Sequence, residues 1–223
     1  MDGQDTDQVE LFVSDQEDGM EDDGIVRSSS EELLTVDAMH WQQRLLLIRP
    51  LLLPYMLPLF LVFWAEYTIN QGVAPVLLFP ADGKPFQALR DYYVFYQFLY
   101  QTGVFISRSS LSVFPVRRVW LLGALQVVNL LVLISQAMFG YIDSVWWISV
   151  IILWEGLLGG STYVNAFANI AADTDPQYRE YSMGVAAVAD TLGITMAGLS
   201  SVFLSPALCQ WQVGRGVQLC KQV

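Results

Sequence analysis

Residues 119–139 read VWLLGALQVVNLLVLISQAMF, a run without a single charged side chain. The hydrocarbon core of a bilayer is about 30 Å thick and is crossed by about 20 apolar residues in a helix. The whole chain is 54% hydrophobic and 15% charged, whereas a soluble domain carries roughly 25% charged residues. The run therefore predicts a transmembrane helix, and the composition predicts an integral membrane protein.

Outward from this run, the same criterion finds four further spans. They lie at about residues 51–78, 92–106, 145–171 and 178–204. The span at 92–106 is only weakly hydrophobic, but Gln97, Gln101 and Arg108 fall on one helical face, which favours a helix. We therefore expect an all-α bundle of about five transmembrane helices within residues 41–208.

Prolines set the expected shape of the first and last spans. Pro54 and Pro58 near the start of the first span and Pro75 near its end predict a kinked helix, because proline removes a backbone donor. The last span is expected to end before Pro206. An atypical tail, residues 209–223, then follows.

The acidic charge of the chain belongs to one segment. The formal net charge is −11, but most of the acidic residues lie in residues 1–40 and the remainder is close to neutral. Such an acidic, apolar-poor segment predicts disorder, because it cannot bury enough apolar surface to offset ordering. We expect no nucleic-acid partner for the near-neutral remainder.

The distribution of arginines predicts the orientation. Arg44 and Arg49 precede the first span, and Arg117 and Arg118 follow the second, whereas the loop after the third span carries only Asp143. Cytosolic loops are enriched in basic residues, so the N-terminus is expected in the cytosol and the C-terminus outside or in a lumen. Two bases in the loop before residue 92 count against this orientation.

Three carboxylates lie inside predicted spans, where a charge costs about 2.5–3.5 kcal/mol on insertion scales. These are Glu66, Glu155 and Asp190. Glu66 shares a face with Asn70, and Glu155 begins a polar and small stripe that also holds Gly159, Thr162, Ala166, Asn169 and Asp173. One interpretation is close helix packing through small residues, which also fits Gly156, Gly160 and Ser161 and, beside Asp190, Ala186, Gly193, Ala197 and Ser201. The other is a substrate or proton pathway, because close packing alone would not require carboxylates.

The remaining reactive residues indicate no enzyme. Arg108 either pairs with an intramembrane carboxylate or marks the cytosolic end of its span, and the arginines that follow favour the second interpretation. The sequence shows no metal cluster, phosphate loop or nucleophile motif, so we expect no catalytic residue, metal or cofactor. Cys209 and Cys220 are expected to be free thiols, since the large apolar core needs no disulfide framework.

Several motifs in order resemble the C-terminal half of the battenin family, the lysosomal membrane proteins of Batten disease (neuronal ceroid lipofuscinosis). They are FWAEYTINQG at 63–72, YQTGVFISRSSL at 100–111, EGLLGG at 155–160 with YVN at 163–165, and DTLGI at 190–194. The resemblance implies a lysosomal or late endosomal protein of eleven spans in two halves, similar to the major facilitator fold. It also implies links to lysosomal pH, autophagy, transport of basic amino acids and clearance of glycerophosphodiesters.

The chain departs from that family at both ends. The six N-terminal spans are absent, so the chain is expected to be a fragment or a variant product. Past Leu208-Cys209-Gln210 the chain continues, where the family stops in a Cys-Gln-Leu-Ser prenylation box. The final residues 220–223 read CKQV, a poor box because its middle positions are not aliphatic.

A sorting signal is a further expectation. An acidic dileucine signal for cytosolic sorting adaptors resembles the four consecutive residues Glu31, Glu32, Leu33 and Leu34. Phosphorylation of Ser29 would supply the acidic position that the signal lacks. The other interpretation is an ordinary acidic tail with two leucines at the start of the linker.

Two functions are compatible with these residues. In one, the chain is half of a secondary transporter for a small-molecule solute, embedded in the lipid bilayer and completed by the missing N-terminal half. Its pathway would be lined by six polar side chains, Glu66, Asn70, Gln101, Glu155, Asn169 and Asp190. In the other, the chain is a non-transporting membrane scaffold whose polar stripes only pack helices.

Overall fold

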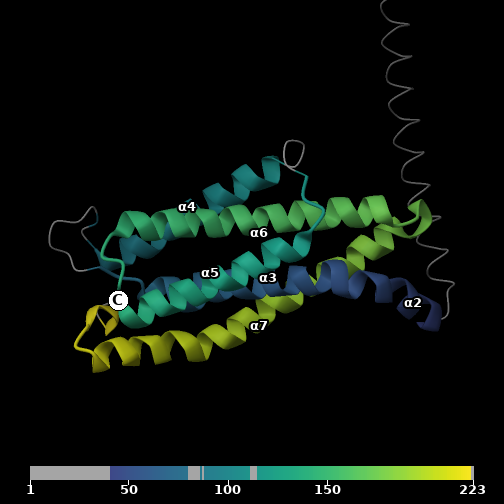
Figure 1. Ribbon diagram of the computed structural model, residues 1–223. Helices are drawn as coiled ribbons and strands as arrows, with labels where there is room; N and C mark the ends of the chain where they lie inside the picture. The colour runs from purple at the N-terminus through teal and green to yellow at the C-terminus, as the bar shows by residue number, and fades with distance from the viewer. Residues whose placement is uncertain (1–40, 80–85, 87, 111–114, 222–223) are drawn as a thin grey trace, which may run out of the picture.

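The computed structural model describes residues 41–79, 86, 88–110 and 115–221, and these form helices without strands (Figure 1). The predicted disorder of residues 1–40 and the dileucine signal at residues 31–34 lie outside the described residues. The elements are α2 (Trp41–Leu51), η1 (Leu52–Met56), α3 (Leu57–Thr68), η2 (Ile69–Val73), η3 (Ala74–Val76), α4 (Leu89–Ser109), α5 (Val119–Phe139), α6 (Val145–Asp173), η4 (Pro176–Tyr178), α7 (Arg179–Gly214) and η5 (Leu219–Lys221).

The predicted all-α membrane bundle is confirmed. Four segments are long and apolar enough to cross a bilayer: Arg44–Val76, Val119–Phe139, Val145–Asp173 and Pro176–Gly214. The fifth, α4, has 21 residues but is less apolar, in line with its weak hydrophobic signal. About five spans therefore follow from length and composition.

The prolines bend the first helix without breaking it. Pro54 lies in η1, a π-helical turn, Pro58 lies at the start of α3, and Pro75 lies in η3, a 3₁₀ turn. Helix formation begins at Trp41, ten residues before the predicted start at 51. The predicted kinks are thus local changes of helix type in one segment.

The expected end of the last span before Pro206 is wrong. Helix α7 continues through Pro206 to Gly214, so residues 209–214 of the predicted tail are helical. A proline inside a helix removes one hydrogen bond, and packing against neighbouring helices compensates for that loss in a membrane bundle. In α7 that packing includes buried Leu208, two residues after the proline.

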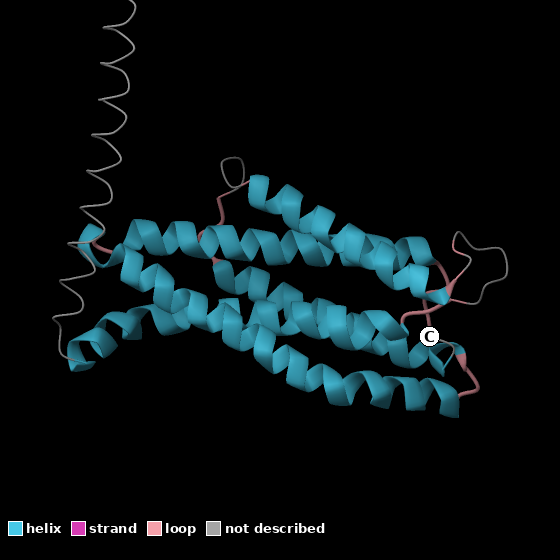
Figure 2. Ribbon diagram, turned by 180° about the vertical axis from the view of Figure 1, so that it is seen from behind, coloured by secondary structure: helices cyan, strands magenta, loops and turns pink. Residues whose placement is uncertain are grey.

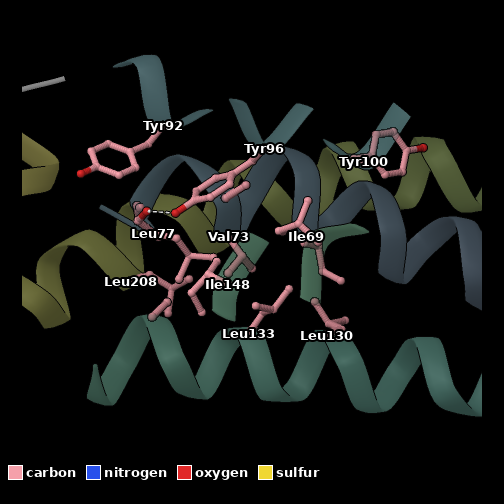
Figure 3. Packing of buried hydrophobic residues seen from close by; sticks show 14 of the residues in the cluster. Ile69, Val73, Leu77, Tyr92, Tyr96, Tyr100, Leu130, Leu133, Ile148 and Leu208 are labelled. Carbon is pink, nitrogen blue, oxygen red and sulfur yellow. Dashed lines mark hydrogen bonds between the residues drawn. The ribbon is translucent and has the colours of Figure 1, made fainter. Parts of the chain in front are cut away.

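Helix α3 lies at the centre of the bundle and packs against α5, α6 and α7, whereas α4 packs against α6. The long helices run side by side, with the start of α2 and the turn between α6 and α7 at one end and the C-terminus at the other (Figures 1 and 2). An apolar cluster from the first span (α3, η2 and η3), α4, α5 and α6, with Leu208 of α7, fills part of the interior (Figure 3). In this cluster the Tyr96 hydroxyl donates to the Leu77 carbonyl at 3.2 Å.

Small residues allow the helices to approach closely, as the packing interpretation predicted. A Cβ atom at Gly156 would collide with the Tyr100 carbonyl of α4, and one at Gly103 would collide with the Leu153 carbonyl of α6. A Cβ at Gly193 of α7 would lie 2.6 Å from the Phe60 carbonyl of α3. Both helix pairs therefore meet backbone to backbone.

The prediction of two free thiols is wrong. Cys209 and Cys220 form a disulfide with their Cα atoms 5.7 Å apart. Helix α7 ends at Gly214, and Gly216 adopts a φ of 90° that reverses the chain. The reversal returns Cys220 to the side of the helix that carries Cys209, a path that no periodic signal in the sequence indicates.

Candidate functional site

Three neighbouring segments bring five polar side chains into one buried cluster. The Tyr100 hydroxyl of α4 donates to Glu66 Oε1 of α3. Asn70 Nδ2 in η2 donates to Glu155 Oε1 of α6 at 2.9 Å and to the Glu66 backbone carbonyl at 3.0 Å. Gln97 Nε2 of α4 donates to Asn70 Oδ1 at 2.7 Å. These five residues are called the carboxylate cluster below.

The two carboxylates are inaccessible to solvent. Glu66 is 1% exposed and Glu155 is 0% exposed. The Oε2 atom of each has no hydrogen-bond partner among the described residues. A Cβ atom at Gly159 would overlap the Glu66 carboxylate, so the absence of a side chain at Gly159 creates the space that this carboxylate occupies. Because Glu155 lies one turn before Gly159, both carboxylates face the same interior region.

This arrangement is suited to holding a proton or a small cation. Two buried carboxyl groups with no basic hydrogen-bond partner in the described structure repel each other when both are ionised. Each also keeps one oxygen free to accept a further bond. A buried charge without a partner is costly, so the site gains stability when a proton or cation neutralises it. Packing alone does not account for such a pair.

Among the described residues, Arg108 forms no ion pair with an intramembrane carboxylate, although its charge interacts with Glu66 at longer range. It lies in the last turn of α4, exposed, with its guanidinium 4.5 Å from the centroid of the Tyr163 ring. Tyr163 in turn contacts Phe63 edge to face and Phe167. This is a cation–π contact at the edge of an aromatic group from α3 and α6. The finding agrees with the interpretation that Arg108 marks the end of its span.

Three of the predicted pathway residues lie outside the carboxylate cluster. Gln101 is exposed on α4, because it lies about 100° around the helix from Tyr100. Asn169 donates to the Val116 carbonyl at 3.0 Å and so holds the chain that leads into α5. Asp190 is half-buried on α7, and its side chain accepts a bond from the neighbouring Thr191.

Sequence reasoning missed two members of the carboxylate cluster and a second polar group. Gln97 was predicted only to lie on a helical face, and Tyr100, one turn later on the same face, was not predicted as a site residue. On α5, Gln126 is 0% exposed, and neither of its side-chain polar atoms has a hydrogen-bond partner in the described part of the chain. Asn129 Nδ2 is likewise unpaired there. The sequence signal that could have indicated this second group is the presence of Gln126 and Asn129 in an otherwise apolar span.

The fold and the carboxylate cluster define a polytopic α-helical membrane protein with an ionisable site in its interior. The chain matches the family described as CLN3 protein over residues 3–211, and it belongs to that family. The expected battenin resemblance is therefore confirmed. No solved structure matches the chain, so the likeness to the major facilitator fold continues to rest on the family resemblance.

Fungal relatives support the same assignment. The chain is 50% identical over 175 residues to Protein BTN1 of Chaetomium globosum, covering 78% of this chain and 38% of the relative. It is 44% identical over 196 residues to Protein BTN1 of Kluyveromyces lactis, covering 88% and 51%. It is 47% identical over 183 residues to that of Yarrowia lipolytica, covering 82% and 46%. The chain thus spans between about two fifths and one half of these relatives' length.

Proposed function

We propose that this chain is one half of a secondary transporter of the lysosomal or late endosomal membrane, and that the carboxylate cluster carries the coupling proton or cation. The observation that carries the proposal is the burial of Glu66 and Glu155 together, each with one unpaired oxygen. Carboxylates inside a bilayer are costly and typically mark ion pathways. The solute is a basic amino acid or a glycerophosphodiester, as the family resemblance implies.

The position of the carboxylate cluster supports a coupling role over direct contact with the solute. In transporters built from two repeats, the solute binds between the halves. Glu66 and Glu155 are already buried within this half, where Tyr100 of α4 and Asn70 of η2 are their hydrogen-bond partners. Neutralisation there weakens the bond from Tyr100 of α4 to Glu66 and the bond from Asn70 of η2 to Glu155 of α6, and so links protonation to the packing of the first span against α4 and α6.

Two observations support an orientation with the N-terminus in the cytosol and the C-terminus in the lumen. Arg44, Arg49 and Arg179 belong to α2 and the start of α7, and Arg108, Arg117 and Arg118 to the end of α4 and the connection to α5, against Arg90, Arg215 and Lys221 on the opposite connections. This excess of described bases on one side is what the positive-inside rule expects of the cytosolic side. At the other end, the Cys209–Cys220 disulfide requires an oxidising compartment. Both favour an orientation in which the C-terminal end lies away from the cytosol.

Conservative substitutions at the two carboxylates test the proposal. Glu66→Gln and Glu155→Gln, made in this chain together with the remaining spans, keep the shape of each side chain and remove its charge. We expect near-normal expression but reduced uptake, or uptake with an altered pH dependence, of basic amino acids or glycerophosphodiesters into liposomes. Glu180→Gln is the matched control, because Glu180 is exposed at the start of α7. Unchanged flux at every pH with normal targeting would favour the scaffold function.

A further inference from the structure

A groove on the side of the bundle lies between η1 and the start of α5. Its volume is about 660 Å³, which is within the usual range for a small-molecule site. Its lining includes Pro54 and Tyr55 from the first span, Arg117 and Arg118 just before α5, and Leu121 and Ala124 on the first turns of α5. None of these residues belongs to the carboxylate cluster.

The two walls of the groove are joined at a backbone carbonyl that a proline leaves without its helical hydrogen bond. In the π-helical turn η1, the Leu57 N–H bonds the Leu52 carbonyl. The Leu53 carbonyl would next be bonded by residue 58, but Pro58 has no N–H. The indole Nε1 of Trp120 donates to this free carbonyl at 2.9 Å. Trp120, which also lines the groove, therefore joins the two walls at a fixed separation.

One rim of the groove is cationic. The Arg118 side chain is exposed, and among the described residues it makes no hydrogen bond or ion pair; only its backbone carbonyl accepts a bond, from the Leu121 N–H. Arg117 Nη1 lies 3.2 Å from Asp173 Oδ1, and both side chains are largely exposed. An exposed pair of this kind contributes little free energy, so Arg117 can also bind a second anion. Tyr55 donates to the other oxygen of Asp173, which anchors that carboxylate beside the groove.

The remaining wall is apolar and lies at membrane depth. Helix α5 is a candidate span that begins at Val119, so Arg117 and Arg118 lie near the membrane surface. Leu121 and Ala124 are exposed one turn deeper, where acyl chains are found. Trp120 is 44% exposed between the two levels, the position that tryptophan prefers at the interface. A ligand that complements both parts needs an anionic head and an apolar tail.

We propose that this groove binds one phospholipid with an anionic headgroup from the leaflet on the Arg117 and Arg118 side. The phosphate and any carboxylate of the headgroup contact the two guanidinium groups, which suit bidentate recognition of such anions. The acyl chains lie along Leu121 and Ala124. The site is independent of the proposed transport function, because it uses no residue of the carboxylate cluster.

Lipid binding to the purified full chain tests this inference. Phosphatidylserine or phosphatidylcholine is titrated into detergent micelles, and bound lipid is counted by native mass spectrometry. We expect one tight phosphatidylserine site and weaker phosphatidylcholine binding. Arg117→Gln combined with Arg118→Gln should weaken phosphatidylserine binding about fivefold for each arginine. Ala124→Trp should weaken it by filling the apolar wall without any change of charge.

Matched controls separate the groove from general electrostatic attraction. Arg49→Gln combined with Arg179→Gln removes two exposed arginines at the same end that do not line the groove, and it should retain binding. Inorganic phosphate, which lacks acyl chains, should not displace the lipid at equal concentration. The inference is overturned if the control pair loses as much affinity as the groove pair, if Ala124→Trp has no effect, or if phosphate alone competes equally.

Discussion

The contact between α4 and α6 gives the sharpest stability prediction. Gly156→Ala places a Cβ against backbone atoms of α4: it would collide with the Tyr100 carbonyl oxygen and lie 3.0 Å from the Val104 nitrogen. Backbone atoms cannot rotate away as a side-chain end can, so α4 must move from α6. Gly184→Ala is the matched control, because nothing lies within 4 Å of a Cβ at that helical position.

The two substitutions are expected to change the free energy of unfolding in opposite directions. Overpacking costs about 1–3 kcal/mol, and displacement of Tyr100 weakens its bond to Glu66, worth about 1.5–3 kcal/mol for a charged acceptor. Alanine gains about 1 kcal/mol over glycine in a helix. Gly156→Ala should therefore lower stability by roughly 1–3 kcal/mol, whereas Gly184→Ala should be neutral or raise it by up to about 1 kcal/mol.

Thermal unfolding of the purified chain in detergent, followed by tryptophan fluorescence, measures the difference. About 2–4 °C per kcal/mol is typical for a chain of this size, so the two variants should differ by roughly 2–16 °C in Tm. Equal melting temperatures for the two variants would show that α4 and α6 do not meet backbone to backbone. A loss in both would show that any added methyl group in this bundle is destabilising.

Three further predictions concern the disulfide near the C-terminus, the sorting signal near the N-terminus, and transport by this chain without the remaining spans. Alkylation of the unfolded chain should modify neither Cys209 nor Cys220 before reduction and both after it, as read by intact mass; two adducts without reductant would contradict the disulfide. Leu33→Ala combined with Leu34→Ala should shift the protein from lysosomes to the plasma membrane, as seen by microscopy, and continued lysosomal delivery would place the sorting signal elsewhere. The chain alone should not transport, because one half provides one wall of a cavity and no second gate; saturable uptake by liposomes that contain only this chain would refute that reasoning.

The sequence by itself determined the number and approximate position of the spans. Transfer of a helix into a bilayer depends on about 20 consecutive residues, so it is a local property that composition reports directly. The third span, Val119–Phe139, is identical in the structure. Small residues also predicted close packing, because a helical period assigns them to one face. The motifs that resemble the battenin family are also short stretches of consecutive residues, so they can be recognised without the tertiary structure.

Only the tertiary structure decided which faces meet. A helical period places Glu66 beside Asn70 and Glu155 beside Gly159, but it does not say that Tyr100 reaches the first carboxylate. Neighbours across helices depend on the rotation of each helix about its axis, which is set by packing along its whole length. The same long-range packing left Gln101 exposed, and a backbone reversal after α7 joined Cys209 to Cys220. Contacts between distant segments therefore made the candidate site, and no local pattern encodes them.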